Sequence, residues 1–198
     1  MKETHDIKGR LQIRVIDRAG AVVEERNVSN KIVGSGYKMI ANLFAGVANA
    51  KTIGFFGIGS GMAPTKESTN DLATPVAIFD IQWRKAVNNP AKVEPVLDAN
   101  GVATGHIKVT ITGELDFNEP KGIPVDLAEA GLFNADKAVV KKTGGIKPGE
   151  EITKTKVDTI STKKGGTAPP EDLYNRVVFE KIHKTADFKL TLIWEIIF

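Results

Sequence analysis

The chain has 198 residues, of which 41% are hydrophobic, and its 27 Lys and Arg nearly balance 24 Asp and Glu. That length suffices for one domain with a core, with or without a sizeable insertion, and the composition is typical of a globular protein. The balance of charge argues against a nucleic-acid-binding protein, which would show a basic stripe with interleaved aromatic residues.

Cysteine is absent, which excludes disulfides and thiolate metal sites in this chain. The first residues, Met1–Ile7, lack the apolar core of a signal peptide. No run approaches the roughly 18 apolar residues that a membrane helix needs. We therefore expect a protein that is made in the cytoplasm and has no membrane partner, and that stays soluble unless an assembly carries it out.

The first elements are predicted to be a hairpin. Leu11, Ile13 and Val15 alternate with mostly polar residues, which indicates a strand with one buried face. The turn residues of 17–20, with Gly20 where a positive φ is expected, are followed by a returning strand. Residues 9–27 therefore read as a β-hairpin.

A helix is predicted within residues 29–46. Its apolar residues recur at helical spacing and are Ile40, Leu43, Phe44 and Val47. Ser35 would be the N-cap, and Gly46 would end the helix. We expect this to be the only substantial helix, with its apolar stripe covering one face of a sheet.

The middle of the chain alternates between strands and turns. Residues 77–87 alternate well enough for a strand, and residues 105–117 form another that could be bulged at Gly113. Residues 88–103, which contain Pro90 and Pro95, read as a loop or a loose hairpin.

From Asp136 to Pro170 the composition shifts to Lys, Gly and Thr. We expect residues 137–170 to be an exposed insertion, with 1–136 plus 171–198 as the single domain. The last strand, 187–198, carries apolar residues on both faces, so it should be central or covered on both sides. The fold class predicted from these elements is mainly β: an antiparallel β-sandwich with one packed α-helix and a long loop insertion.

The glycine-rich run Gly57–Gly61 invites a phosphate-loop interpretation. Its spacing is not that of a dinucleotide or Walker loop, and Met62 and Ala63 follow it instead of a helix start. The alternative is the end of a strand, where glycines permit close backbone approach or a tight bend.

Neither the histidines nor the acidic residues are spaced as metal ligands. The three histidines are His5, His106 and His183. Asp126, Glu129 and Asp136 could meet a calcium ion, but they lack the residue order of a calcium loop. We therefore expect no metal site, no cofactor and no catalytic residue.

Among the acidic residues, Glu129 is the main candidate for a functional or structural role, because it lies in an apolar run with Gly131 and Phe133. A carboxylate there could be a catalytic acid with a raised pKa. The favoured interpretation is structural: Glu129 accepts backbone N–H groups or pairs with Arg176, while Gly131 lets the chain bend.

Two tryptophans, Trp83 and Trp194, could line a sugar site. Both lie inside alternating strands, so core packing is the favoured interpretation.

Four segments, in order along the chain, resemble small virion proteins of tailed bacteriophages, especially tail, baseplate and fibre-associated proteins. The segments are Asn30–Leu43, Ile58–Thr65 with Asp71–Thr74, Glu129–Ala135, and Arg176–Phe179 with Lys184–Ile196. The second and third are similar to the N-terminal region of the tail-collar fibre protein. The chain departs from the pattern by placing residues 137–170 where the family has a short glycine-rich turn.

The resemblance implies a non-enzymatic structural protein of the virion, acting as a tail or baseplate adaptor or a fibre-attachment subunit. A capsid decoration or head-fibre protein, and a carbohydrate-binding receptor module that uses residues 137–170, are the alternatives. The expected partners are copies of the chain itself, other virion proteins and, for the receptor alternative, a host surface glycan. No nucleic acid is expected among them.

Overall fold

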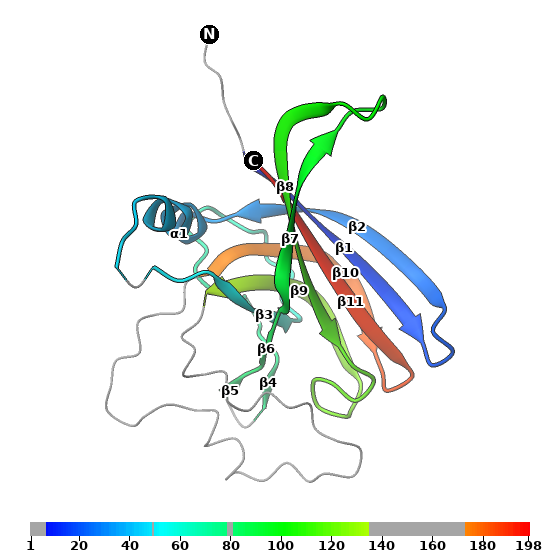
Figure 1. Ribbon diagram of the computed structural model, residues 1–198. Helices are drawn as coiled ribbons and strands as arrows, with labels where there is room; N and C mark the ends of the chain where they lie inside the picture. The colour runs from blue at the N-terminus through cyan, green and yellow to red at the C-terminus, as the bar shows by residue number, and fades with distance from the viewer. Residues whose placement is uncertain (1–6, 49, 79–80, 135–172) are drawn as a thin grey trace.

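The computed structural model describes residues 7–48, 50–78, 81–134 and 173–198. In these residues lie eleven strands and one helix (Figure 1). They are β1 (Lys8–Asp17), β2 (Val22–Ile32), α1 (Gly34–Phe44), β3 (Ile53–Gly59), β4 (Ala77–Ile78), β5 (Ile81–Gln82), β6 (Arg84–Ala86), β7 (Asn88–Leu97), β8 (Ala103–Leu115), β9 (Val125–Asn134), β10 (Leu173–Lys184) and β11 (Phe188–Ile197).

Nine of these strands form one antiparallel sheet in the order β6-β3-β9-β10-β2-β1-β11-β8-β7, which curls into a half-barrel (Figure 1). The predicted β-sandwich is therefore wrong, although the mainly β class with one described helix is correct. The reason lies in β2, which pairs with β1 along most of its length and with β10 at Lys31 and Ile32. One bent sheet thus takes the place of two stacked sheets.

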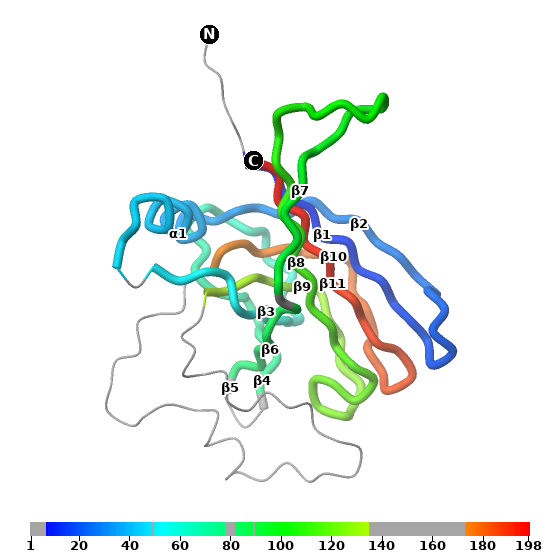
Figure 2. The backbone as a smooth tube through the Cα atoms, viewed as in Figure 1, coloured from blue at the N-terminus to red at the C-terminus, as the bar shows by residue number. Residues whose placement is uncertain are grey.

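The two edge strands of the sheet, β6 and β7, are neighbours in the chain. β6 pairs with β3, as Ala86 lies opposite Phe55, and β7 pairs with β8, as Asn88 lies opposite Thr112. Only Val87 separates the two strands, and its N–H donates to the Gly54 carbonyl at 3.1 Å. The backbone can be followed through this crossing in Figure 2, where β6 leads into β7.

The concave face of the sheet holds the main core. At its centre the ring of Phe56 contacts both tryptophans, with ring centroids 5.7 Å from Trp83 and 5.9 Å from Trp194. Trp194 is fully buried, as the core interpretation predicted. Gly113 lies in a regular ladder opposite Leu192, so the predicted bulge is wrong; a side chain at Gly113 would instead strike the Phe56 ring.

Several predicted strands have the right place but altered bounds. The hairpin of 9–27 is confirmed as β1 and β2, and the last strand is confirmed as central, since β11 lies between β1 and β8. The single strand predicted over 77–87 is replaced by the short strands β4, β5 and β6. The stretch 88–103 is a hairpin made by β7 and the start of β8. Residues 137–170 lie outside the described residues, so the domain division stays a prediction.

Helix α1 is confirmed, but its predicted N-cap is wrong and its predicted covering face is right only at Ile40. Val33 occupies the N-cap without a side-chain hydrogen bond, while the Ser35 hydroxyl donates to the Leu173 carbonyl at 2.5 Å. Gly36 is buried because its backbone lies against the Tyr174 carbonyl. At the other end Gly46, with φ of 64°, ends the helix as predicted.

Of the apolar stripe expected to cover the sheet, Ile40 does pack against the main core, but the other three residues face outward. Leu43, Phe44 and Val47 are exposed, and Phe44 keeps 95% of its surface accessible. The side of α1 that packs on the sheet carries Gly36, Met39 and the partly buried Ile40. The part of the expected stripe at and beyond the last turn of the helix is therefore left exposed.

Candidate functional site

The Glu129 carboxylate is the centre of a buried hydrogen-bond cluster on the face of β9 opposite the main core. Glu129 has no exposed surface. Its Oε1 accepts the N–H groups of Gly61 at 3.0 Å and Thr74 at 2.7 Å. Its Oε2 accepts the N–H of Ala73 at 2.9 Å and Nε of Arg176 at 2.6 Å. Both kinds of partner proposed from the sequence, backbone amides and Arg176, are therefore in contact with it.

Arg176, on β10, is only 2% exposed. It extends the cluster to further residues of the segment that follows β3. Its Nη1 donates to the Ala63 carbonyl at 2.7 Å and to the Thr65 hydroxyl at 3.4 Å. The Thr65 hydroxyl in turn donates to the Arg176 carbonyl at 3.3 Å. Residues 60–76 lie over β9 and β10, and the Glu129–Arg176 pair is hydrogen-bonded to the segment near both of its ends. We call these residues the covering segment.

Glycines make room for this carboxylate. A Cβ at Gly59 would collide with Oε1 of Glu129 and with the Thr74 carbonyl, and one at Gly61 would lie 2.6 Å from the same Oε1. Neither residue has a positive φ. Gly59 and Gly61 thus provide the close backbone approach predicted for the run 57–61. The group that the backbone approaches is the Glu129 carboxylate.

A second, smaller core lies beside the pair and beneath the covering segment. Its buried members are Val33, Phe55, Leu72, Phe133 and Leu173. The Arg84 guanidinium lies 3.7 Å above the centre of the Phe133 ring. Gly131 has no positive φ and stays in a regular ladder opposite Arg176, so the bend predicted there is wrong; a Cβ at Gly131 would instead meet the side chains of Leu72 and Leu173.

The arrangement leaves the Glu129 carboxylate no acceptor position for a substrate. A carboxylate offers about four lone-pair positions, and four donors within the protein already occupy them. Its charge is balanced by a guanidinium as buried as itself. The geometry fits a structural joint better than the alternative of a catalytic acid.

The remaining polar residues singled out in the sequence do not gather with this pair. His106 Nδ1 lies 3.1 Å from the Phe198 carbonyl, and His183 Nδ1 lies 2.8 Å from the exposed carboxylate of Asp126. His5 and Asp136 fall outside the described residues. Within the described parts of the chain, no group of three or more His, Asp or Glu could hold a metal ion. In the same parts, no helix has the length and apolar character to cross a membrane.

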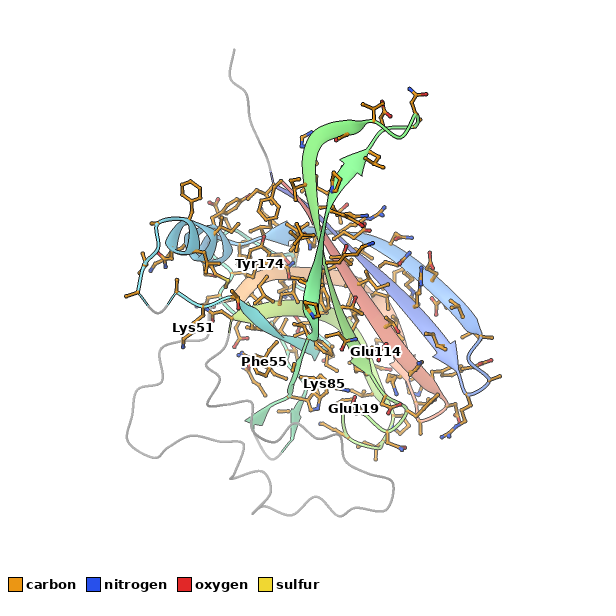
Figure 3. The ribbon with its side chains drawn as sticks, viewed as in Figure 1. Lys51, Phe55, Lys85, Glu114, Glu119 and Tyr174 are labelled. Carbon is orange, nitrogen blue, oxygen red and sulfur yellow. The ribbon has the colours of Figure 1, made fainter. Side chains whose placement is uncertain are left out.

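A buried lysine at the opposite end of the half-barrel escaped the sequence analysis. Lys184 is 1% exposed, and its Nζ donates to the carbonyls of Phe117 at 2.9 Å and Thr185 at 2.8 Å. Beside it, Nζ of Lys85 lies 2.5 Å from the buried carboxylate of Glu119 (Figure 3). The two lysines together hold the loop between β8 and β9. The signal was available, because residue 184 follows Ile182 on the inward side of an alternating strand.

Burial lowers the pKa of Lys184 to about 8. The negative charges of Glu119 and Asp116 act in the other direction and offset part of this lowering. Arg18 adds to the lowering, and Asp187 opposes it. Between pH 8 and 10 the unfolded chain therefore binds more protons at this lysine than the folded chain does, and its contribution to stability rises with pH.

We expect the wild type to gain on the order of 1 kcal/mol of unfolding free energy from pH 7.5 to 9.5, relative to the variant Lys184→Met. Urea unfolding of both proteins at the two pH values measures this difference, in which all other titrating groups cancel. A gap between the two proteins that stays constant or moves the other way would contradict the assignment.

Comparison with known proteins adds no relative to this description. No family model matches the chain, and neither a curated protein nor a solved structure is similar enough to match it.

Proposed function

We propose that this chain is a non-enzymatic structural subunit of a tailed-bacteriophage particle, acting as a tail or baseplate adaptor or as a fibre-attachment subunit. The observation that carries the proposal is spatial. Parts of all four segments on which the resemblance rests lie far apart in the sequence, yet they meet around the Glu129–Arg176 pair; the part from Lys184 to Ile196 lies away from it.

Three of the segments build the pair itself. The segment 58–74 supplies the amides of Gly61, Ala73 and Thr74, while the other two supply Glu129 and Arg176. The meeting of these three segments in a single buried cluster supports the view that they form one structural unit.

The first segment joins the same cluster through α1. The Ser35 hydroxyl donates to the carbonyl of Leu173, and the Gly34 N–H donates at 2.8 Å to the carbonyl of Glu67 in the covering segment. In β2, Lys31 of the same segment pairs directly with Arg176 of β10. Helix, covering segment and sheet are thus joined at this pair, which suits a subunit that must hold its shape between neighbours.

The test is to locate the chain in purified particles of the phage that encodes it. Mass spectrometry of the particles should find it in a fixed copy number, and cryo-electron microscopy should show a curled nine-stranded sheet at the tail or baseplate. Density at the capsid would favour the decoration or head-fibre alternative. Absence of the chain from particles, with abundant chain in the infected cell, would contradict every virion role.

A further inference from the structure

Two groups of exposed large apolar side chains stand out, beside others at Val22, Val23, Met62, Ile123 and Phe198. The first, which we call the helix patch, consists of exposed residues of α1 and of the turn that follows it: Tyr37, Leu43, Phe44 and Val47. The second, which we call the arm, is the outer part of the β7–β8 hairpin, residues 93–107, with Val93, Leu97, Val102 and Ile107 exposed. Exposed apolar patches of this kind mark interaction surfaces in soluble proteins.

The arm stands away from the body of the molecule (Figure 1). Every residue from Leu97 to Ile107 is exposed, so both faces of the hairpin meet solvent there. An isolated two-stranded hairpin is marginally stable in water unless something packs against it. A docked neighbour would supply that packing.

Charges distinguish the two surfaces. No acidic residue occurs between Arg26 and Lys66, and Lys31 and Lys38 are exposed. The acid that packs against α1 is the exposed Glu67, at the N-terminal end of the helix, where its carbonyl accepts the Gly34 N–H. The arm has no Lys or Arg and carries Glu94 and Asp98.

The acid of the arm that faces outward is Asp98. Glu94 is already paired with Lys92 and Lys108 at the base of the hairpin. Asp98 uses one oxygen to accept the amides of Asn100 and Val102, which shapes the turn. Its charge has no cation beside it within residues 93–107.

These charges disfavour contacts between like surfaces. Two helix patches face to face would bring Lys38 near Lys38, with Glu67 of each copy at the other end of its helix, and two arms would bring Asp98 near Asp98. An arm against a helix patch joins apolar to apolar and acid to base, which is the complementary arrangement.

Edge-to-edge strand pairing is disfavoured as well. Pro95 lies opposite Ile107, whose N–H and C=O bond to Phe198 on the other side. The nitrogen of Pro95 therefore points to the free edge of β7, where it offers no N–H. The arm is suited to docking through its side chains.

Within one molecule the two surfaces cannot meet, because α1 and the arm project from different sides of the half-barrel (Figure 1). We propose that the arm of one copy docks on the helix patch of the next copy. Such a head-to-tail contact generates a ring if the rotation closes and a filament if it does not. The inference rests on the surfaces of this chain alone, so it can hold or fail independently of the proposed virion role.

The first experiment uses sedimentation of the purified full chain and two charge variants, Phe44→Glu in the helix patch and Leu97→Glu in the arm. The wild type should sediment as a species larger than the 21.4 kDa monomer. Each variant should weaken self-association by at least roughly thirtyfold, as loss of a central contact does. The control Ile123→Glu changes an equally exposed residue outside both surfaces and should associate as the wild type does.

Mixing the two variants decides between head-to-tail and symmetric contacts. The Phe44→Glu chain keeps its arm, and the Leu97→Glu chain keeps its helix patch, so an equimolar mixture should form a dimer and nothing larger. A wild type that stays monomeric at high concentration, or variants that associate normally, would overturn the proposal. Failure of the mixture to form dimers would do the same.

A disulfide trap gives a second reading that does not depend on the charge variants. The chain has no cysteine, so Phe44→Cys and Leu97→Cys each introduce a single thiol. The two variants mixed under mild oxidation should yield a covalent dimer, and each alone should yield none at the same concentration. A dimer of Phe44→Cys with itself as the main product would instead indicate a symmetric contact and contradict the proposal.

Discussion

Replacing Glu129 with glutamine should lower the free energy of unfolding by about 3–5 kcal/mol, the range seen when one partner of a buried ion pair is removed. In either orientation the new amide NH₂ would face two donors. They are the N–H groups of Gly61 and Thr74 on one side, or those of Ala73 and Arg176 on the other. The guanidinium would also lose the charge that compensates it.

Thermal unfolding followed by circular dichroism measures the effect, which for a chain of this size corresponds to a melting temperature lower by roughly 6–20 °C. The matched control is Glu25→Gln. Glu25 pairs with Arg14 at 3.1 Å, but both side chains are 41% exposed, and such surface pairs contribute about 0–1 kcal/mol. Equal losses for the two variants would mean that the Glu129 pair does not hold the covering segment.

The variant Gly59→Ala should also destabilise the protein, by about 1–3 kcal/mol or more, as overpacking of a core does. The added methyl group would strike the Glu129 carboxylate and the Thr74 carbonyl. Neither group can retreat easily, because Glu129 is fixed by four donors and Thr74 by its own backbone contacts in the covering segment.

The same strand provides the control. A Cβ at Gly54 in β3 would meet nothing within 4 Å, so Gly54→Ala should leave stability unchanged or raise it slightly by restricting the unfolded chain. Chemical denaturation of both variants measures the comparison. If Gly59→Ala were as stable as Gly54→Ala, the carboxylate would have more room than the structure gives it.

Alternation along the sequence was enough to place most strands but not to assign their neighbours. The pattern in β1 and β11 reports which side chains face inward, yet it is the same whether the strands belong to one curled sheet or two stacked ones. The switch of β2 from β1 to β10 at Lys31 leaves no mark on that pattern. Pro90 and Pro95 left residues 88–103 open between a loop and a loose hairpin, because proline is rare in central strands. The hairpin is correct, since β7 lies at an edge, where proline is tolerated.

The buried pair could be anticipated because a carboxylate in an apolar run requires partners wherever it lies. Its connection to the covering segment could not, because the donors are backbone amides of Gly61, Ala73 and Thr74, and every non-proline residue carries such a group. The outward face of α1 was missed for a related reason. Helical spacing shows that Leu43 and Phe44 are on one side of the helix, but not whether the sheet or a neighbour is to cover them.

The central position of β11 has a consequence for how the chain folds. β11 fills the gap between β1 and β8, and Lys8 pairs with Ile197 across nearly the whole sequence. While the ribosome still holds residues 188–197, β1 and β8 can form only local hairpins with β2 and β7. The sheet must then close over a very long loop, which slows folding. Chains that still lack β11 would have an unclosed sheet with exposed apolar surface. Any assembly would therefore draw its subunits only from chains whose translation has passed this strand.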